Sequence, residues 1–196
     1  MDNLFQLIKP HFVNSQNLPH LEVEFRLGKI HGKYFDTNVG EFAFNKIFDS
    51  LENFNGWENV IKSETTSYFV GNRRMDIDET TEETKSIIKK RITKLDHVIP
   101  GQPLDVRFST AQEDPIGDIS CEEEMDFMRC KRRTSFIRKN LSIDMTIVTA
   151  DPDDPDDESE NFYEIELEII DPLEVQSDKL LYNIIFKIQS ILNILQ

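Results

Sequence analysis

The chain has 196 residues, a formal net charge of −15, 38% hydrophobic residues and 30% charged residues. It is long enough to bury the core of one domain, and its negative charge argues against broad adhesion to nucleic acid or to an anionic membrane. Its two cysteines form no disulfide framework, its first residues resemble no signal peptide, and no apolar run is long enough to span a bilayer. We therefore expect one domain, over residues 1–196, in a reducing intracellular compartment and without a membrane partner.

The hydrophobic pattern predicts helices near both ends of the chain and strands between them. A short helix is expected over residues 2–9, and a second, over 40–54, follows a first strand at 21–27. Further strands are expected at 59–70, 72–77, 85–93, 103–112, 122–137, 140–148 and 161–170. An acidic, proline-rich run over 151–160 predicts an exposed loop, and 173–196 predicts a helix with a wide apolar face.

These elements predict an α+β, mainly β fold: an eight-stranded antiparallel β-barrel flanked by helices. Three apolar helical faces need a surface to cover, and the apolar side of the strands offers one. The charged side of each strand would then face the interior of the barrel.

Glutamates alternate along two of the predicted strands, one near each end of the chain. Glu22 and Glu24 share one face of the first strand, because successive side chains of a strand point to opposite faces. Glu164, Glu166 and Glu168 share one face of the last strand in the same way. Five carboxylates on two short strands repel one another unless a cation lies between them, and a divalent cation prefers such oxygen ligands. The alternative is a half-solvated sheet whose glutamates face water.

Basic residues alternate along the other strands with the opposite sign. They are Arg26, Arg73, Lys89, Arg91, Arg107, Lys131 and Arg133, accompanied by Glu113, Asp144 and Thr146. On any one strand, cross-strand ion pairing would explain them. Both signs in one cavity suit metal-assisted work on a polyphosphate, in which carboxylates hold the cation and basic residues neutralise the phosphates. Seven glycines supply no Gly-rich phosphate loop, and neither Cys121 nor Cys130 is followed by an arginine six residues on, so side chains must bind the phosphates.

In this ordered set of strands the chain resembles the triphosphate tunnel metalloenzymes. Among them it is most similar to the metal-dependent RNA 5′-triphosphatases of fungal and large-DNA-virus mRNA capping systems. The resemblance spans residues 21–170 and rests on the Glu22–Glu24 strand, on 87–92, 105–113, 131–136 and 141–146, and on the Glu164–Glu168 strand. It implies a tunnel of eight antiparallel strands that uses manganese or magnesium to hydrolyse the γ-phosphate of triphosphate-ended RNA.

The resemblance also implies roles for single residues. Glu22 and Glu24 would be metal ligands, completed by one or more of Glu164, Glu166 and Glu168, with Glu168 the first choice for direct contact. The phosphate-binding cations would be Arg26, Arg73, Lys89, Arg91, Arg107, Lys131 and Arg133, of which Lys89, Arg107, Lys131 and Arg133 would stabilise the transition state. Glu113 would orient the attacking water, and Asp144 and Thr146 would brace the basic residues. Fungal members have an arginine where this chain has Ser142, so either Arg132 or Arg138 replaces it or the tunnel has one cation fewer.

The same resemblance implies partners. The substrate would be a 5′-triphosphate RNA end, with nucleoside triphosphates possible, and the product a diphosphate end for a guanylyltransferase domain or subunit. Because the sequence ends inside a helical pattern at Gln196, we expect an N-terminal part of a longer capping enzyme. A viral member would act in the host cytoplasm or the virion. Two alternatives stay open: a phosphatase for inorganic tripolyphosphate or small triphosphates with the same tunnel, and a noncatalytic charged barrel that binds a partner.

Overall fold

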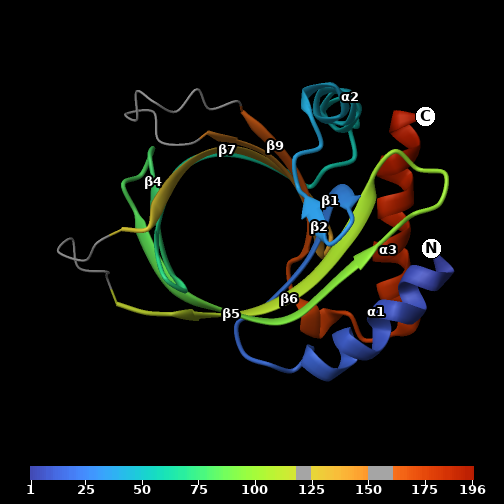
Figure 1. The fold of residues 1–196 in the computed structure, drawn as a ribbon, viewed down its shortest axis with the longest axis horizontal. Coiled ribbons are helices and arrows are strands. Elements are labelled where there is room, and N and C mark those ends of the chain that lie inside the picture. Colours follow the sequence, from blue (N-terminus) through green and yellow to red (C-terminus); the bar gives the residue numbers. More distant parts are fainter. Residues whose placement is uncertain (118–124, 150–160) are drawn as a thin grey trace.

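The computed structural model describes residues 1–117, 125–149 and 161–196, and a closed antiparallel barrel forms its centre (Figure 1). The barrel strands are β1 (Leu21–His31), β3 (Asn59–Val70), β4 (Arg73–Asp78), β5 (Thr84–His97), β6 (Asp105–Pro115), β7 (Phe127–Arg138), β8 (Leu141–Thr149) and β9 (Phe162–Ile169). Their order is β1-β6-β5-β4-β3-β7-β8-β9, and β9 pairs with β1 to close the ring. The predicted eight-stranded antiparallel barrel is therefore confirmed.

The closing pair of strands carries both glutamate patterns. In the β1–β9 register Glu24 lies opposite Glu168, and Arg26 lies opposite Glu166. Directly opposite residues of an antiparallel pair point to the same face. The first and last strands, more than 140 residues apart in sequence, thus bring their charged side chains to one place.

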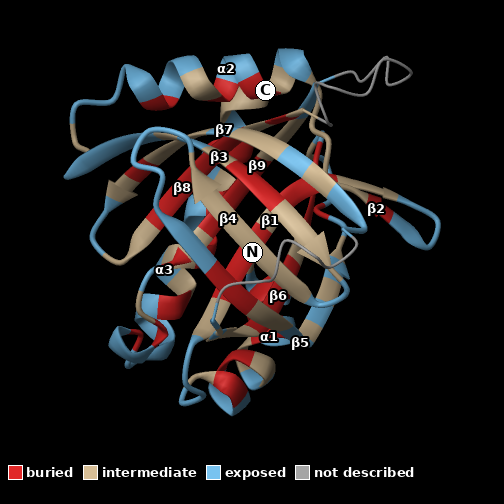
Figure 2. Cartoon of the chain, turned by 90° about the vertical axis from the view of Figure 1, so that its left-hand side faces the viewer, coloured by how far each residue is buried: buried red, intermediate tan, exposed pale blue. Residues whose placement is uncertain are grey.

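Three helices cover the outside of the barrel, and the hydrophobic core lies between them and the strands (Figure 2). They are α1 (Asp2–Ser15), α2 (Glu41–Glu52) and α3 (Asp178–Leu192), with short 3-10 turns η1 (Pro172–Glu174) and η2 (Asn193–Leu195). Phe48 of α2 packs against Phe136 of β7, with ring centroids 5.7 Å apart. Val23, Phe25 and Leu27, the residues of β1 that alternate with the charged ones, are fully buried. The apolar side of the strands therefore faces outward, under the helices.

Some element boundaries differ from the sequence prediction. α1 continues through Pro10 to Ser15, because Phe12 in its last turn is buried in the core. The short strand β2 (Tyr34–Asp36), which the sequence did not predict, forms a hairpin with β1. The last helix starts at Asp178, where the Ser177 side chain accepts a hydrogen bond from the Leu180 backbone N–H. The predicted loop over 151–160 and the first part of the strand predicted at 122–137 lie outside the described residues.

None of the helices in the described ranges is long and apolar enough to cross a membrane.

Candidate active site

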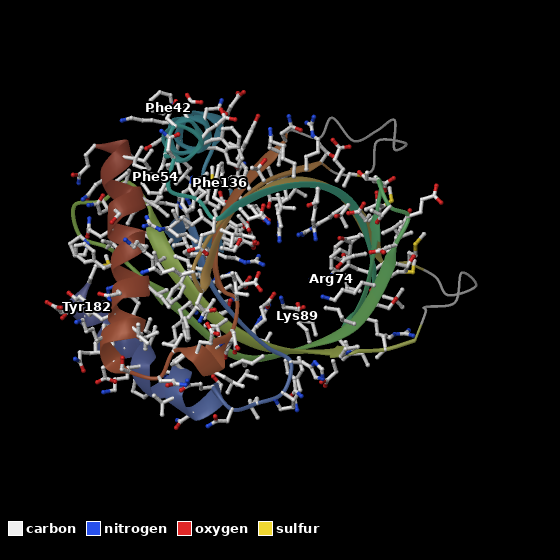
Figure 3. All side chains as sticks on the ribbon, turned by 180° about the vertical axis from the view of Figure 1, so that it is seen from behind. Phe42, Phe54, Arg74, Lys89, Phe136 and Tyr182 are labelled. Carbon is white, nitrogen blue, oxygen red and sulfur yellow. The ribbon has the colours of Figure 1, made fainter. Side chains whose placement is uncertain are left out.

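The inward face of the barrel collects charged residues from seven of the eight barrel strands. Glu22, Glu24 and Arg26 of β1 lie opposite Ala111, Ser109 and Arg107 of β6, so all six share that face. Lys89 of β5 lies opposite Glu113 of β6, and Arg133 of β7 lies opposite Thr146 of β8. Figure 3 shows Lys89 and Arg74, from the neighbouring strands β5 and β4, both pointing into the enclosed space. Part of that space is a polar cavity of about 80 Å³ beside Glu24, Arg26 and Lys89.

Three carboxylates gather on this face, and burial together with neighbouring acidic groups disfavours the ionised form of two of them. Burial and the charge of Glu24 raise the pKa of Glu22 to about 8, although Lys89 opposes this rise. Burial and Asp144 raise the pKa of Glu168 to about 7. Glu24 is 7% exposed and is held by Ser109, whose hydroxyl donates to its Oε1 at 2.6 Å, and by Arg26, whose Nε donates at 3.1 Å. A divalent cation would relieve the repulsion among these three groups.

Glu166, on the same face of β9, has a different environment. It forms ion pairs with Arg26 at 2.8 Å and with Arg133 at 3.0 Å. Burial alone would raise its pKa, but the two arginines lower the pKa to about 2. Glu164 accepts a hydrogen bond from the Thr37 hydroxyl at 3.0 Å. In this structure Glu166 is therefore paired with two arginines, and its role as a metal ligand stays a prediction.

The residues present fit a divalent cation at Glu22, Glu24 and Glu168. Among the described residues, no three acidic, histidine or cysteine side chains are gathered closely enough to hold a metal ion. The carboxylate of Glu22 is paired with Lys89, and that of Glu24 with Arg26 and Ser109. The three donors are nonetheless all carboxylates, the ligands that hard cations prefer, on two paired strands. Binding would replace the present partners of Glu22 and Glu24.

Glu113 of β6 lies between two cations, Lys89 of β5 and Arg74 of β4. Its Oε1 is 3.1 Å from the Nζ of Lys89 and 3.6 Å from an Nη of Arg74. Burial would raise the pKa of Glu113, but Lys89 and Arg74 lower it below the ordinary value. The buried Oε1 accepts no hydrogen bond of normal geometry. Glu113 is therefore an ionised acceptor, able to orient a water molecule.

Arg133 is the most firmly positioned cation of the site. Its guanidinium donates to the Thr146 hydroxyl at 3.0 Å, to Asp144 at 3.2 Å and to Glu166 at 3.0 Å. Asp144 is in turn held by the Ser142 hydroxyl at 2.5 Å. Asp144 and Thr146, expected from the family resemblance to brace the basic residues, thus both accept hydrogen bonds from Arg133.

Lys131, two residues before Arg133, makes no ion pair within the described part of the chain. Burial and the charge of Arg74 lower its pKa to about 8. A cation held in this way gains from the arrival of an anionic ligand, because the ligand supplies the missing counter-charge.

Two other predicted cations already have strong partners. Arg26 lies between Glu24 and Glu166, and these carboxylates raise its pKa although burial opposes the rise.

Arg107 pairs with Asp96, with donor–acceptor distances of 2.6 and 2.9 Å, and its Cζ lies 4.5 Å from the ring centroid of Phe35. Gly28 permits this arrangement, because a Cβ there would lie 2.1 Å from the Asp36 carbonyl oxygen and 2.5 Å from the Phe35 ring. Arg107 therefore lies apart from Glu113 and Lys131, beside the β1–β2 hairpin. Arg91 lines the cavity that also contains Lys89.

The prediction for Arg73 is corrected by the strand register. In the β4–β5 register Arg74 lies opposite Ile87, which shares the inward face of β5 with Lys89 two residues later. Arg73 lies opposite Ile88, on the outward face. Arg74 therefore supplies the inward cation of β4. Neither arginine considered as a replacement at Ser142 is placed there, since Arg132 lies on the outward face opposite Glu64 and Arg138 lies 5.4 Å from the ring of Phe54. Ser142 itself donates a hydrogen bond to Asp144.

The sequence prediction missed several inward-facing cations, among them Arg74, Arg129 and Lys94. Arg74 could not be told from its neighbour Arg73 in a short strand. Arg129 precedes Lys131 and Arg133 at the same two-residue spacing, so extending that pattern by one step would have found it. Lys94 lies opposite Ser109 only because a register shift between Arg91 and Thr93 changes which residues of β5 face inward. No local sequence signal reveals that shift.

Comparison with known proteins agrees with this geometry. The family model described as "mRNA capping enzyme, beta chain" matches residues 59–180. The RNA triphosphatase Pct1 of S. pombe has the same fold, with a TM-score of 0.84 and 14% identity over 96% of this chain and 92% of that chain. The mimivirus capping enzyme triphosphatase is also similar, with a TM-score of 0.68 and 17% identity over 98% of each chain. No curated protein sequence matches the chain significantly.

Because the family model covers more than half of the chain, this protein belongs to the mRNA capping enzyme beta-chain family. This is a family of metal-dependent triphosphatases, which are hydrolases of phosphoric anhydrides, and the cofactor is a divalent cation.

Proposed function

We propose that the protein hydrolyses the γ-phosphate of triphosphate-ended RNA, giving a diphosphate end and inorganic phosphate, the first step of mRNA capping. The observation that carries the proposal is the placement of Glu22, Glu24 and Glu168 on one part of the tunnel wall and of a set of cations on the rest. A polyphosphate with a divalent cation has the charges that such an interior accepts.

The cation that Glu22, Glu24 and Glu168 would hold supplies positive charge to phosphate oxygens; manganese and magnesium both suit an all-carboxylate site. Lys89, Arg74, Lys131 and Arg133 bind the remaining phosphate oxygens and stabilise the charge of the transition state. Arg133 needs no reorganisation for this, because three acceptors fix its guanidinium. Preorganised charges of this kind supply most of the catalysis in phosphoryl transfer.

Glu113 accepts a hydrogen bond from the attacking water and directs it at the γ-phosphorus. Lys89 keeps Glu113 ionised and, from the other side, contacts Glu22. When the cation takes the place of Lys89 at Glu22, Lys89 keeps its contact with Glu113 and is free to bind a phosphate oxygen.

Partners follow from the product. A diphosphate RNA end is the substrate of a guanylyltransferase, so we propose a guanylyltransferase domain or subunit as the functional partner. The description of the mimivirus relative as the RNA triphosphatase domain of a trifunctional capping enzyme supports this; that domain is 16% identical over 99% of this chain.

Product analysis tests the proposal. RNA labelled in the γ- or in the β-phosphate is incubated with the protein and manganese, beside inorganic tripolyphosphate. We expect release of the γ-label alone and a diphosphate RNA end. Hydrolysis of tripolyphosphate without hydrolysis of RNA would retain the site and reject the capping role, whereas release of the β-label would reject the proposed reaction.

A further inference from the structure

Two aromatic rings on the inward face lie at the end of the tunnel where β3 ends and β7 begins. Phe69 and Phe127 are opposite each other in the β3–β7 register, and their rings are stacked with centroids 4.4 Å apart at 14°. Phe127 is 48% exposed. No local sequence pattern predicts this pair, because the two positions are 58 residues apart.

The aromatic pair is continuous with the row of cations along β7. Phe127, Arg129, Lys131 and Arg133 occupy alternate positions and therefore share the inward face. The Nζ of Lys131 lies 5.8 Å from the centroid of Phe69, which confirms that the ring and the lysine are on the same side. Four residues of strand separate Phe127 from Lys131, which is about 13 Å. The side chains approach more closely than the backbone, since the Phe69 ring lies 5.8 Å from the Lys131 Nζ and is stacked on Phe127, so the rings and the cations that would bind phosphate adjoin each other.

Phe69 also adjoins the reacting end of the proposed site. It lies opposite Arg74 in the β3–β4 register, and Arg74 reaches Glu113 at 3.6 Å. One arginine therefore spans from beside the aromatic pair to the carboxylate that would orient water. A ligand whose last phosphate lies at Glu113 has its other end near the rings.

Arg129 lies beside the aromatic stack and, by its distances, not over the outer face of Phe127. Its Cζ is 5.3 Å from the centroid of Phe127 and 5.9 Å from that of Phe69. A guanidinium over the outer face of Phe127 would be much farther from Phe69 than from Phe127, so these similar distances place it at the edge of both rings. The outer face of Phe127 is thus not occupied by Arg129, and a positive charge lies next to it.

We propose that Phe127, backed by Phe69, is a stacking surface for the first base of the triphosphate-ended RNA, and that Arg129 binds a phosphate next to that base. The inference rests on the proposed function and adds to it a recognition of the nucleoside. Every base has a π-face, so such a surface accepts any first nucleotide and reads no sequence. It explains how the tunnel would favour an RNA end over inorganic tripolyphosphate, which has no base.

The test compares ligands with and without the base. Binding of a labelled diphosphate-ended RNA is measured without turnover, beside the same RNA lacking the first base, for the parent, Phe127→Ala, Phe127→Trp and Phe42→Ala. Phe42 is 81% exposed on α2, on the outside of the barrel, and serves as the matched control. Loss of one base–aromatic stack should weaken binding of the complete RNA about 5- to 150-fold. Phe127→Trp should restore the affinity, and Phe42→Ala should not change it.

The RNA without its first base should bind the parent and Phe127→Ala equally. Equal binding of the complete RNA to parent and Phe127→Ala would overturn the proposal. So would an equal loss for both RNAs, because it would show that Phe127 only supports the strands. Two hydrolysis assays separate the two proposals. A stacking role leaves kcat/KM for inorganic tripolyphosphate, which has no base, within about 2-fold of the parent in Phe127→Ala. Failure of the proposed function instead removes γ-phosphate release from triphosphate-ended RNA by the parent itself.

Discussion

Glu166 and Glu168 lie two residues apart on the inward face of β9, and their replacement by glutamine should affect stability in opposite directions. Glu166 is 6% exposed and pairs with Arg26 and Arg133. Removing one partner of a buried ion pair costs about 3–5 kcal/mol, because the remaining charge is left uncompensated. The pKa of Glu166 agrees: a value of about 2, against 4.5 for an ordinary glutamate, corresponds to roughly 3 kcal/mol at about 1.4 kcal/mol per pKa unit.

The signs follow from the two pKa values. The pKa of Glu166 is lower in the folded chain, so its stabilisation is present above about pH 4.5 and is lost as pH falls toward 2. The pKa of Glu168 is raised to about 7, so its ionisation costs stability as pH rises from about 4.5 to 7. At pH 8 without metal, Glu166→Gln should lower the free energy of unfolding by about 3–5 kcal/mol, and Glu168→Gln should leave it unchanged or raise it.

Urea denaturation at pH 8 in the presence of a chelator measures both variants. For a chain of this length the loss in Glu166→Gln corresponds to a decrease in Tm of about 6–20 °C. Equal destabilisation by the two substitutions would refute the distinction between a brace and a metal ligand. A stable Glu166→Gln variant would show that the two arginines do not need its charge.

Three further predictions concern the cations and the metal. Lys131, with its pKa lowered to about 8, should lose its proton above that pH, so kcat/KM of the parent should decline above pH 8. Lys131→Arg should remove this decline, because arginine stays protonated. A pH profile that is the same in the variant and the parent would contradict the assignment. Manganese at 100 times its Kd should stabilise the parent by about 2.7 kcal/mol, which is measured as a rise in Tm. Glu24→Gln should abolish this rise. An equal rise in Tm of the parent and the variant would exclude Glu24 as a metal ligand. Asp144→Asn should lower kcat/KM about 10-fold or more by loosening Arg133, whereas Ser142→Ala should have the smaller effect; the reverse order in steady-state kinetics would contradict the bracing role.

The sequence predicted the barrel because its strands alternate strictly. Val23, Phe25 and Leu27 are fully buried outside the barrel while Glu22 and Glu24 face inward, as the two-residue period requires. The two glutamate strands could be assigned to one site only with the help of a family resemblance, since nothing local indicates that β9 closes on β1.

The parts that the sequence did not predict depend on register and on partners. A register shift in β5 turns Lys94 inward, and the choice between Arg73 and Arg74 is decided by their neighbours on β3 and β5. The different roles of Glu166 and Glu168 depend on which of them meets two arginines. Patterns along one strand contain no information about contacts across the tunnel.

The central claim is that inward-facing carboxylates and a divalent cation act together on a triphosphate. The most direct test is γ-phosphate release from triphosphate-ended RNA as manganese is titrated, for the parent, Glu24→Ala and Glu52→Ala, an exposed glutamate of α2. We expect metal-dependent release by the parent and Glu52→Ala, and a rate lower by about 10²–10³ in Glu24→Ala. Undiminished release by a folded Glu24→Ala variant, or release from the parent that persists in a chelator, would contradict the account.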